Sequence, residues 1–129
     1  MSEARILVVE DNDRNRKLVR DVLQHAGFEV VEAPTGERGV DLARENPPDL
    51  VLMDLQLPGI DGTEAFRQLR QSPSTAAVPI VALTAFAMRE DQERVERLGF
   101  DGYLTKPLNV RALPKQVRGY LTRGGPCDD

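Results

Sequence analysis

Four short apolar runs of this sequence are followed by side chains that could do chemistry. Two carboxylates follow the first run, and a carboxylate, a hydroxyl and an ammonium group follow the other three. In chain order these residues are Glu10, Asp11, Asp54, Thr84 and Lys106. If the runs are parallel strands of one open sheet, their carboxyl ends meet at a single edge, where such sheets bind ligands. Three carboxylates gathered there would repel one another unless a cation sits among them. Lys106 would add a positive charge from the opposite side.

A hard, oxygen-seeking cation suits this set of side chains. Mg²⁺ fits better than Zn²⁺, because the sequence has one cysteine, Cys127, and one histidine, His25, neither placed to complete a zinc site. A carboxylate flanked by a metal ion and an ammonium group, with a hydroxyl nearby, is equipped to attack a phosphoryl group. The predicted product is an aspartyl phosphate.

The apolar runs alternate with segments of helical spacing. The runs cover residues 6–9, 30–31, 50–53, 80–83 and 102–104. Gly27 is placed to end the first helix, Thr35 to cap the second, and Pro47-Pro48 to break the chain before the third strand. Continuously apolar strands indicate burial on both faces, and hence a parallel sheet covered by helices on each side. The predicted fold class is α/β, a doubly wound sheet of five strands.

The composition of the chain argues against nucleic-acid binding and against a membrane span. The chain has 129 residues, 17 Lys and Arg against 21 Asp and Glu, and a net charge of −4 without a basic run, which argues against nucleic-acid binding. A lone cysteine favours a reducing compartment, and no apolar stretch is long enough for a membrane span. We expect a soluble, cytoplasmic protein with one domain over residues 1–122 and a disordered tail over 123–129.

Four segments together make the sequence similar to the response-regulator receiver domain of two-component signalling, over residues 5–121. They are residues 6–12, 49–62, 79–85 and 102–107. The resemblance implies a flavodoxin-like sheet in the order 2-1-3-4-5 with five helices. It also implies a signalling phosphoacceptor that catalyses only its own phosphotransfer and dephosphorylation.

The resemblance assigns roles to individual residues. Asp54 is the phosphoacceptor, Lys106 pairs with the phosphoryl group, and Thr84 donates its hydroxyl to it. Mg²⁺, with Mn²⁺ as a substitute, is held by Glu10, Asp11, Asp54 and the backbone carbonyl of Gln56. The peptide between Lys106 and Pro107 is expected to be cis.

The resemblance also implies a switch and a control of phosphate lifetime. Thr84 moves toward the phosphoryl group, and Tyr103 turns into the space it leaves, which alters the face formed by the fourth helix, fifth strand and fifth helix. Gln56 and Phe86 influence hydrolysis, and the bulk of Phe86 predicts a persistent phospho-form. Pro114 lies inside the last helical pattern, so that helix either starts near Leu113 or is distorted.

Expected partners are a sensor histidine kinase or a histidine phosphotransfer protein, and a downstream protein target or kinase. No nucleic acid and no membrane is expected to bind, and the chain is expected to be a monomer or a phosphorylation-dependent dimer. Because no output region follows residue 122, we expect a stand-alone receiver, similar to single-domain regulators of cell-cycle and phosphorelay kinases.

Three other functions share parts of this pattern. A phosphohydrolase of the haloacid-dehalogenase type needs a second aspartate two residues after the nucleophile, where this chain has Gln56. A flavodoxin-like cofactor binder needs a phosphate-cradling loop after the first strand, where this chain has the acidic residues 10–13. A receiver used only as an unphosphorylated docking module stays open.

Overall fold

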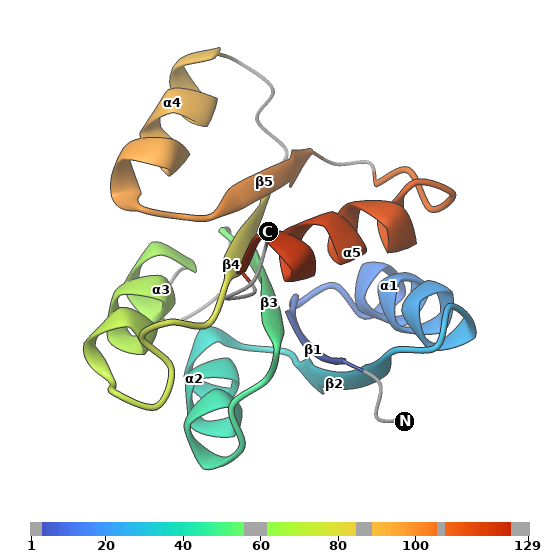
Figure 1. Ribbon diagram of the computed structural model, residues 1–129, viewed down its shortest axis with the longest axis horizontal. Coiled ribbons are helices and arrows are strands. Elements are labelled where there is room, and N and C mark those ends of the chain that lie inside the picture. Colours follow the sequence, from blue (N-terminus) through green and yellow to red (C-terminus); the bar gives the residue numbers. More distant parts are fainter. Residues whose placement is uncertain (1–3, 56–61, 85–88, 106–107, 125–129) are drawn as a thin grey trace.

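Strands and helices alternate along the whole chain in the computed structural model, which describes residues 4–55, 62–84, 89–105 and 108–124 (Figure 1). The strands are β1 (Arg5–Val9), β2 (Glu29–Ala33), β3 (Leu50–Asp54), β4 (Ile80–Thr84) and β5 (Gly102–Thr105). The helices are α1 (Asp13–His25), α2 (Gly36–Glu45), α3 (Gly62–Gln71), α4 (Arg89–Leu98) and α5 (Leu113–Gly124). None of the helices within the described residues is long and apolar enough to cross a membrane.

The strands form one parallel sheet in the order β2-β1-β3-β4-β5. Its register places Val9 beside Ala33 and Met53, and Thr84 beside Thr105. The carboxyl ends of the strands therefore lie together along one edge. The predicted fold class, strand order and number of helices are confirmed.

Helices cover both faces of the sheet (Figure 1). Side chains of each strand alternate between two apolar clusters, since successive residues of a strand point to opposite faces. Leu7, Val9 and Met53 belong to the cluster under α2, α3 and α4, whereas Val8 and Leu52 belong to the cluster under α1 and α5. The sheet is thus the shared centre of two cores.

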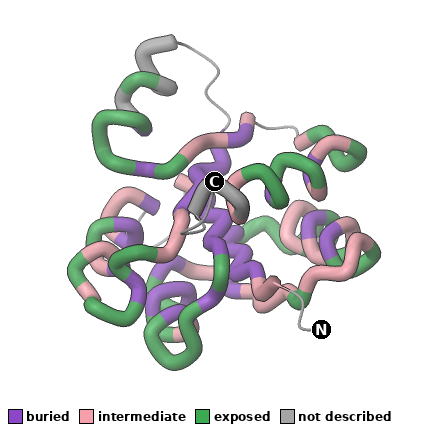
Figure 2. Tube along the Cα trace, viewed as in Figure 1, coloured by how far each residue is buried: buried purple, intermediate pink, exposed green. Residues whose placement is uncertain are grey.

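Burial is not uniform across the five strands, as Figure 2 shows. Every residue of β3 and β4 is buried, but β2 is buried only at Ala33 and β5 only at Leu104. Both faces of β2 and β5 still contact the clusters, through Val31 and Tyr103 on one side and Val30 and Leu104 on the other, but burial there is less complete than continuous apolar runs predict. These strands form the two edges of the sheet, where each has a neighbour on one side only.

The helix ends follow the predicted signals. The side chain of Thr35 accepts a hydrogen bond from the backbone N–H of Arg38 and caps α2. Gly27 follows the end of α1 with a φ of 101°, a conformation that glycine adopts without strain. Pro114 is the second residue of α5, where its missing N–H costs nothing, so the first of the two expected arrangements is confirmed. The tail predicted over residues 123–129 falls largely outside the described residues, while α5 itself runs to Gly124.

Candidate metal and phosphoryl site

The segment after β1 carries two acidic side chains in different environments. Glu10 is only 2% exposed, while Asp11 lies at the surface. The backbone N–H of Glu10 donates to the carbonyl of Ala33 at 3.0 Å, which extends the pairing with β2 by one residue. One carboxylate oxygen of Glu10 accepts from the N–H of Asn12 at 3.1 Å. These bonds fix the acidic segment where β1 ends.

Asp54 ends β3 and is 3% exposed. Its backbone is held in place by the next residue, because Leu55 donates to Leu83 of β4 at 3.2 Å and accepts from the N–H of Gly62 at 3.1 Å. Gly62 begins α3 directly against this turn: a Cβ there would lie 2.3 Å from the carbonyl oxygen of Asp54. Only a glycine lets α3 start this close to the acidic residue.

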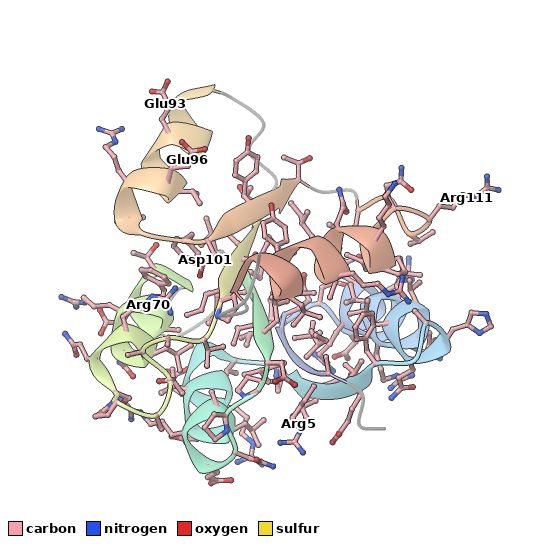
Figure 3. All side chains as sticks on the ribbon, in the orientation of Figure 1. Arg5, Arg70, Glu93, Glu96, Asp101 and Arg111 are labelled. Atoms are coloured by element: carbon pink, nitrogen blue, oxygen red, sulfur yellow. The ribbon has the colours of Figure 1, made fainter. Side chains whose placement is uncertain are left out.

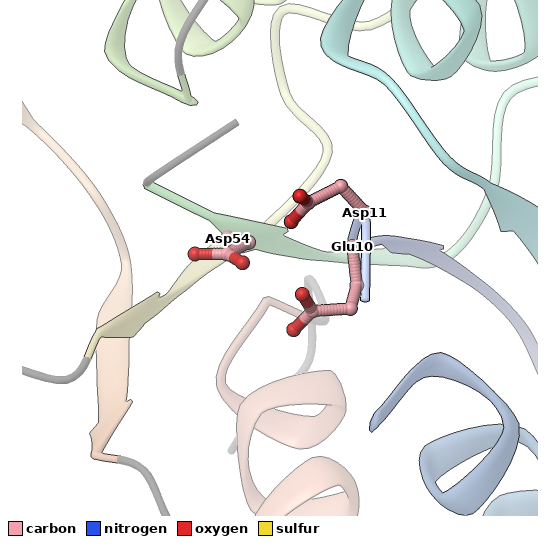
Figure 4. Close-up of side chains that lie close together, drawn as sticks. All are labelled: Glu10, Asp11 and Asp54. Carbon is pink, nitrogen blue, oxygen red and sulfur yellow. The ribbon is translucent and has the colours of Figure 1, made fainter. Parts of the chain in front are cut away.

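Glu10, Asp11 and Asp54 bring their carboxylates to one place, shown in Figure 4. Each offers an oxygen, and these oxygens lie within 4.8 Å of one another. Two of the three residues are buried, so water screens their mutual repulsion poorly. A purely oxygen donor set with negative charge fits Mg²⁺ or a similar hard cation.

Thr84 lies at the same edge, one strand further along. It ends β4, which is paired with β3, and is 4% exposed. Tyr103 follows on β5, where it is half-buried and packs against the apolar cluster under α4. The structure therefore places Glu10, Asp11, Asp54 and Thr84 at one edge of the sheet, with Tyr103 on the neighbouring strand.

Four predicted site residues lie outside the described residues: Gln56, Phe86, Lys106 and Pro107. The carbonyl ligand, the ammonium group, the cis peptide and the control of phosphate lifetime therefore stay predictions.

The structure adds three residues to this site that the sequence reasoning did not single out. Asn12 caps α1 by accepting from the N–H of Asn15 at 2.9 Å, a role that an asparagine before a helix could have signalled. Arg16 donates to the backbone carbonyl of Glu10 at 3.0 Å. Gly62 allows the close approach of α3 to Asp54, a tertiary contact that has no signal in a single sequence.

Comparison with known proteins agrees with this geometry. The family model for the response regulator receiver domain matches residues 6–118. The chain is also similar to the polar-differentiation response regulator DivK of Brucella ovis, with 40% identity over 116 residues, which is 90% of this chain and 94% of that protein.

The chain is also similar to solved structures of a response regulator and of a receiver domain. The chemotaxis response regulator CheY4 of Vibrio cholerae is 28% identical with a TM-score of 0.87, over 92% of this chain and 99% of that one. The receiver domain of a sensor histidine kinase from Pseudomonas aeruginosa, which has a magnesium ion coordinated in its active-site cleft, is 33% identical with a TM-score of 0.85, over 93% of this chain and 98% of that one. With its parallel sheet, its acidic edge and these relatives, the chain belongs to the response regulator receiver domain family.

Proposed function

We propose that this receiver accepts a phosphoryl group on Asp54 from a phosphohistidine of a kinase or a phosphotransfer protein, in a Mg²⁺-dependent reaction. One observation carries the proposal: the carboxylates of Glu10, Asp11 and Asp54 converge within 4.8 Å at the carboxyl edge of the sheet. A second supports it, since Thr84 ends the adjacent strand in a buried position. The roles proposed for Lys106 and Gln56 rest on the sequence resemblance, because both residues lie outside the described residues.

In the proposed reaction, a carboxylate oxygen of Asp54 attacks phosphorus in line with the phosphorus–nitrogen bond of the phosphohistidine. That bond breaks as the new oxygen–phosphorus bond forms, and the imidazole leaves with the electron pair and takes up a proton. Thr84 donates its hydroxyl to a phosphoryl oxygen, and Lys106 places its ammonium group on another. The burial of Asp54 limits the access of competing water.

Glu10, Asp11, Asp54 and the carbonyl of Gln56 are the residues that would hold the metal ion. When bound, Mg²⁺ neutralises the charge on the carboxylates and on the transferring phosphoryl oxygens. Mn²⁺ prefers the same octahedral oxygen surroundings and is expected to substitute.

Output is proposed to pass through the face formed by α4, β5 and α5 to a protein target or kinase. Phosphorylation draws Thr84 toward Asp54, and Tyr103 turns into the space that Thr84 leaves. Tyr103 is half-buried against the apolar cluster, so a small inward rotation changes what this face presents. Phe86 is expected to slow hydrolysis, so that the phospho-form persists.

The first test is intact-mass analysis after incubation with acetyl phosphate, with and without Mg²⁺. Wild type and Asp41→Asn, a control at an exposed carboxylate of α2, are expected to gain one phosphoryl group only when Mg²⁺ is present. Asp54→Asn is expected to gain none. A folded wild-type protein that binds Mg²⁺ but gains no mass would contradict the proposal and favour a docking module.

A further inference from the structure

The guanidinium of Arg16 joins the acidic segment to two other parts of the fold. One terminal nitrogen donates to the backbone carbonyl of Glu10 at 3.0 Å, and the other donates to the carboxylate of Asp13 at 2.7 Å. The Nε donates to the carboxylate of Glu32 on β2 at 3.2 Å. All three nitrogens are engaged, and the side chain is 17% exposed.

These bonds span the acidic segment on both sides. Glu10 directly follows β1 and Asp13 begins α1, so Arg16 ties the start and the end of the turn that carries Asp11. The N–H of Arg16 also donates to the carbonyl of Asn12 at 2.9 Å. A side chain held from both sides restricts how far the peptide between Glu10 and Asp11 can rotate.

Arg16 is itself held by a second ion pair. Glu32 accepts from Arg16 with one carboxylate oxygen and from Arg20 with the other, at 3.2 and 3.1 Å. The hydrogen bonds that Arg20 donates to the carboxylates of Glu32 and Asp21 raise the pKa of its guanidinium, which stays charged. Glu32 is thus a fixed anchor on β2 for two arginines of α1.

Orientation matters here because carboxylates close together repel one another and tend to turn apart before a cation arrives. The carbonyl of Glu10 belongs to the peptide whose adjoining torsions, ψ of Glu10 and φ of Asp11, set how these two residues are oriented relative to each other. A planar guanidinium with several fixed donors holds a carbonyl in one direction, and a lysine ammonium cannot reproduce three such bonds.

We propose that Arg16 is a positioning residue of the metal site, which holds the peptide between Glu10 and Asp11 so that both carboxylates face Asp54 before the metal ion binds. Residues that orient metal ligands in this way typically change metal affinity by about 10- to 100-fold when they are replaced. The proposal rests on the function proposed above, and it assigns Glu32 as the residue that orients Arg16.

A positioning role and a simple charge effect of Arg16 predict opposite changes in Mg²⁺ affinity when Arg16 is replaced. Arg16 is positive, so if only its charge mattered, its removal would strengthen Mg²⁺ binding. If Arg16 positions the ligands, both Arg16→Met and Arg16→Lys weaken Mg²⁺ binding, by about tenfold. Glu32→Gln, which replaces the charged anchor of Arg16 with a neutral and weaker acceptor, is expected to weaken binding by less than Arg16→Met does.

The experiment is a Mg²⁺ titration of metal-free wild type and the variants by calorimetry, together with amide hydrogen exchange of residues 11–13. Arg20→Met is the matched control, since it removes a positive charge and an ion pair with Glu32 from the same helix without touching the acidic segment. It is expected to bind Mg²⁺ as wild type does. Amide exchange at residues 11–13 is expected to be faster in Arg16→Met and unchanged in Arg20→Met.

Phosphorylation by acetyl phosphate gives a second measurement. In Arg16→Met, the Mg²⁺ concentration for half-maximal rate is expected to rise about tenfold, while the rate at saturating Mg²⁺ stays within about twofold of wild type. A general loss of structure would lower both. If Arg16→Met fails to fold, the Glu32→Gln variant still tests the positioning role, because it leaves Arg16 itself in the chain.

Three outcomes would overturn the positioning role: wild-type affinity in Arg16→Lys, tighter binding in Arg16→Met, or equal weakening in Arg20→Met. Absence of Mg²⁺ binding in wild type would overturn it as well. If wild type binds Mg²⁺ but Asp54 takes no phosphoryl group, the proposed function fails while the positioning role is still decided by the titration.

Discussion

Gly62 sets the distance between α3 and the acidic edge of the sheet. A Cβ at this position would lie 2.3 Å from the carbonyl oxygen of Asp54 and 2.6 Å from the Cα of Leu55. Both contacts are with backbone, which cannot move aside without shifting Asp54 itself. By contrast, a Cβ at Gly119 in α5 would meet nothing within 4 Å.

We therefore expect opposite results from the same substitution at the two glycines. Gly62→Ala is expected to lower the free energy of unfolding by about 1–3 kcal/mol through overpacking and to slow phosphorylation of Asp54. Gly119→Ala is expected to raise it by about 0.5–1 kcal/mol, because alanine favours the helix, and to leave phosphorylation unchanged. Urea unfolding and acetyl phosphate kinetics on both variants check this. A neutral Gly62→Ala would mean that α3 can shift without disturbing Asp54.

At the scale of single residues, the acidic and hydroxyl members of the site were predictable because each directly follows an apolar run. Glu10, Asp54 and Thr84 stand where strands end, and strand ends of one parallel sheet must meet. Arg16 was not predictable, since its partners Glu10 and Glu32 become neighbours only when β2 pairs with β1. Such a contact depends on the register of the fold and leaves no local pattern.

The end of α3 is tied to the strands beyond it through Arg70. Its guanidinium donates to the carboxylate of Asp101 at 2.7 Å and to the backbone carbonyl of Val78 at 2.6 Å, and it lies 5.0 Å from the ring of Phe66. Asp101 also accepts from the N–H of Ile80 at 2.7 Å. Figure 3 labels Arg70 on α3 and Asp101 directly before β5. One carboxylate thus joins a helix to the beginnings of two strands.

We expect Asp101→Ala to lower the free energy of unfolding by about 2 kcal/mol, because it leaves the part-buried backbone N–H of Ile80 without this acceptor and removes the carboxylate from the Arg70 guanidinium. Arg67→Ala is the matched control on the same helix: Arg67 pairs with Glu64 at the exposed surface, where such pairs contribute less than about 1 kcal/mol. Urea denaturation of the two variants measures the difference. Equal losses would show that the Arg70 contacts have no more effect than a surface pair.

At the scale of elements, the strands and their order were predictable, whereas the degree of burial was not. The pair Val30-Val31 predicts β2 as well as the longer apolar runs predict β3 and β4. Yet β2 is half-exposed, since an edge strand has only one neighbour and its charged residues Glu29 and Glu32 reach solvent or arginines. Position within a sheet is a tertiary property, and a local run of apolar residues does not encode it.

The whole molecule consists of two apolar cores that share one sheet. Neighbouring residues of a strand serve different cores: Leu52 faces α1 and α5, while Met53 faces α2 and α3. Loss of either helical layer would expose one face of every strand, so the two cores are expected to unfold together. The chain contains no tryptophan and two tyrosines, of which Tyr103 contacts one core and Tyr120 the other.

Each core therefore has its own fluorescent reporter. Tyr120→Phe leaves only Tyr103, and Tyr103→Phe leaves only Tyr120. We expect the urea midpoint from tyrosine fluorescence to equal the midpoint from far-UV circular dichroism in each variant, as two-state unfolding requires. Two distinct midpoints within one variant would mean that one layer of helices separates from the sheet before the other.

The central position of β1 has a consequence for the growing chain. β1 is made first, but it lies between β2 and β3, and the contact of Arg5 with Asp49 joins residues 44 positions apart. At about 5–20 residues per second, the ribosome needs about 2–9 s to add that length. Once β1 has left the ribosome, one of its hydrogen-bonding edges stays open to other chains until β3 has followed it, an interval of the same length. The rate at which the ribosome moves during that interval, which synonymous codons can change without altering an amino acid, would thus influence how long a nascent chain is exposed to mispairing.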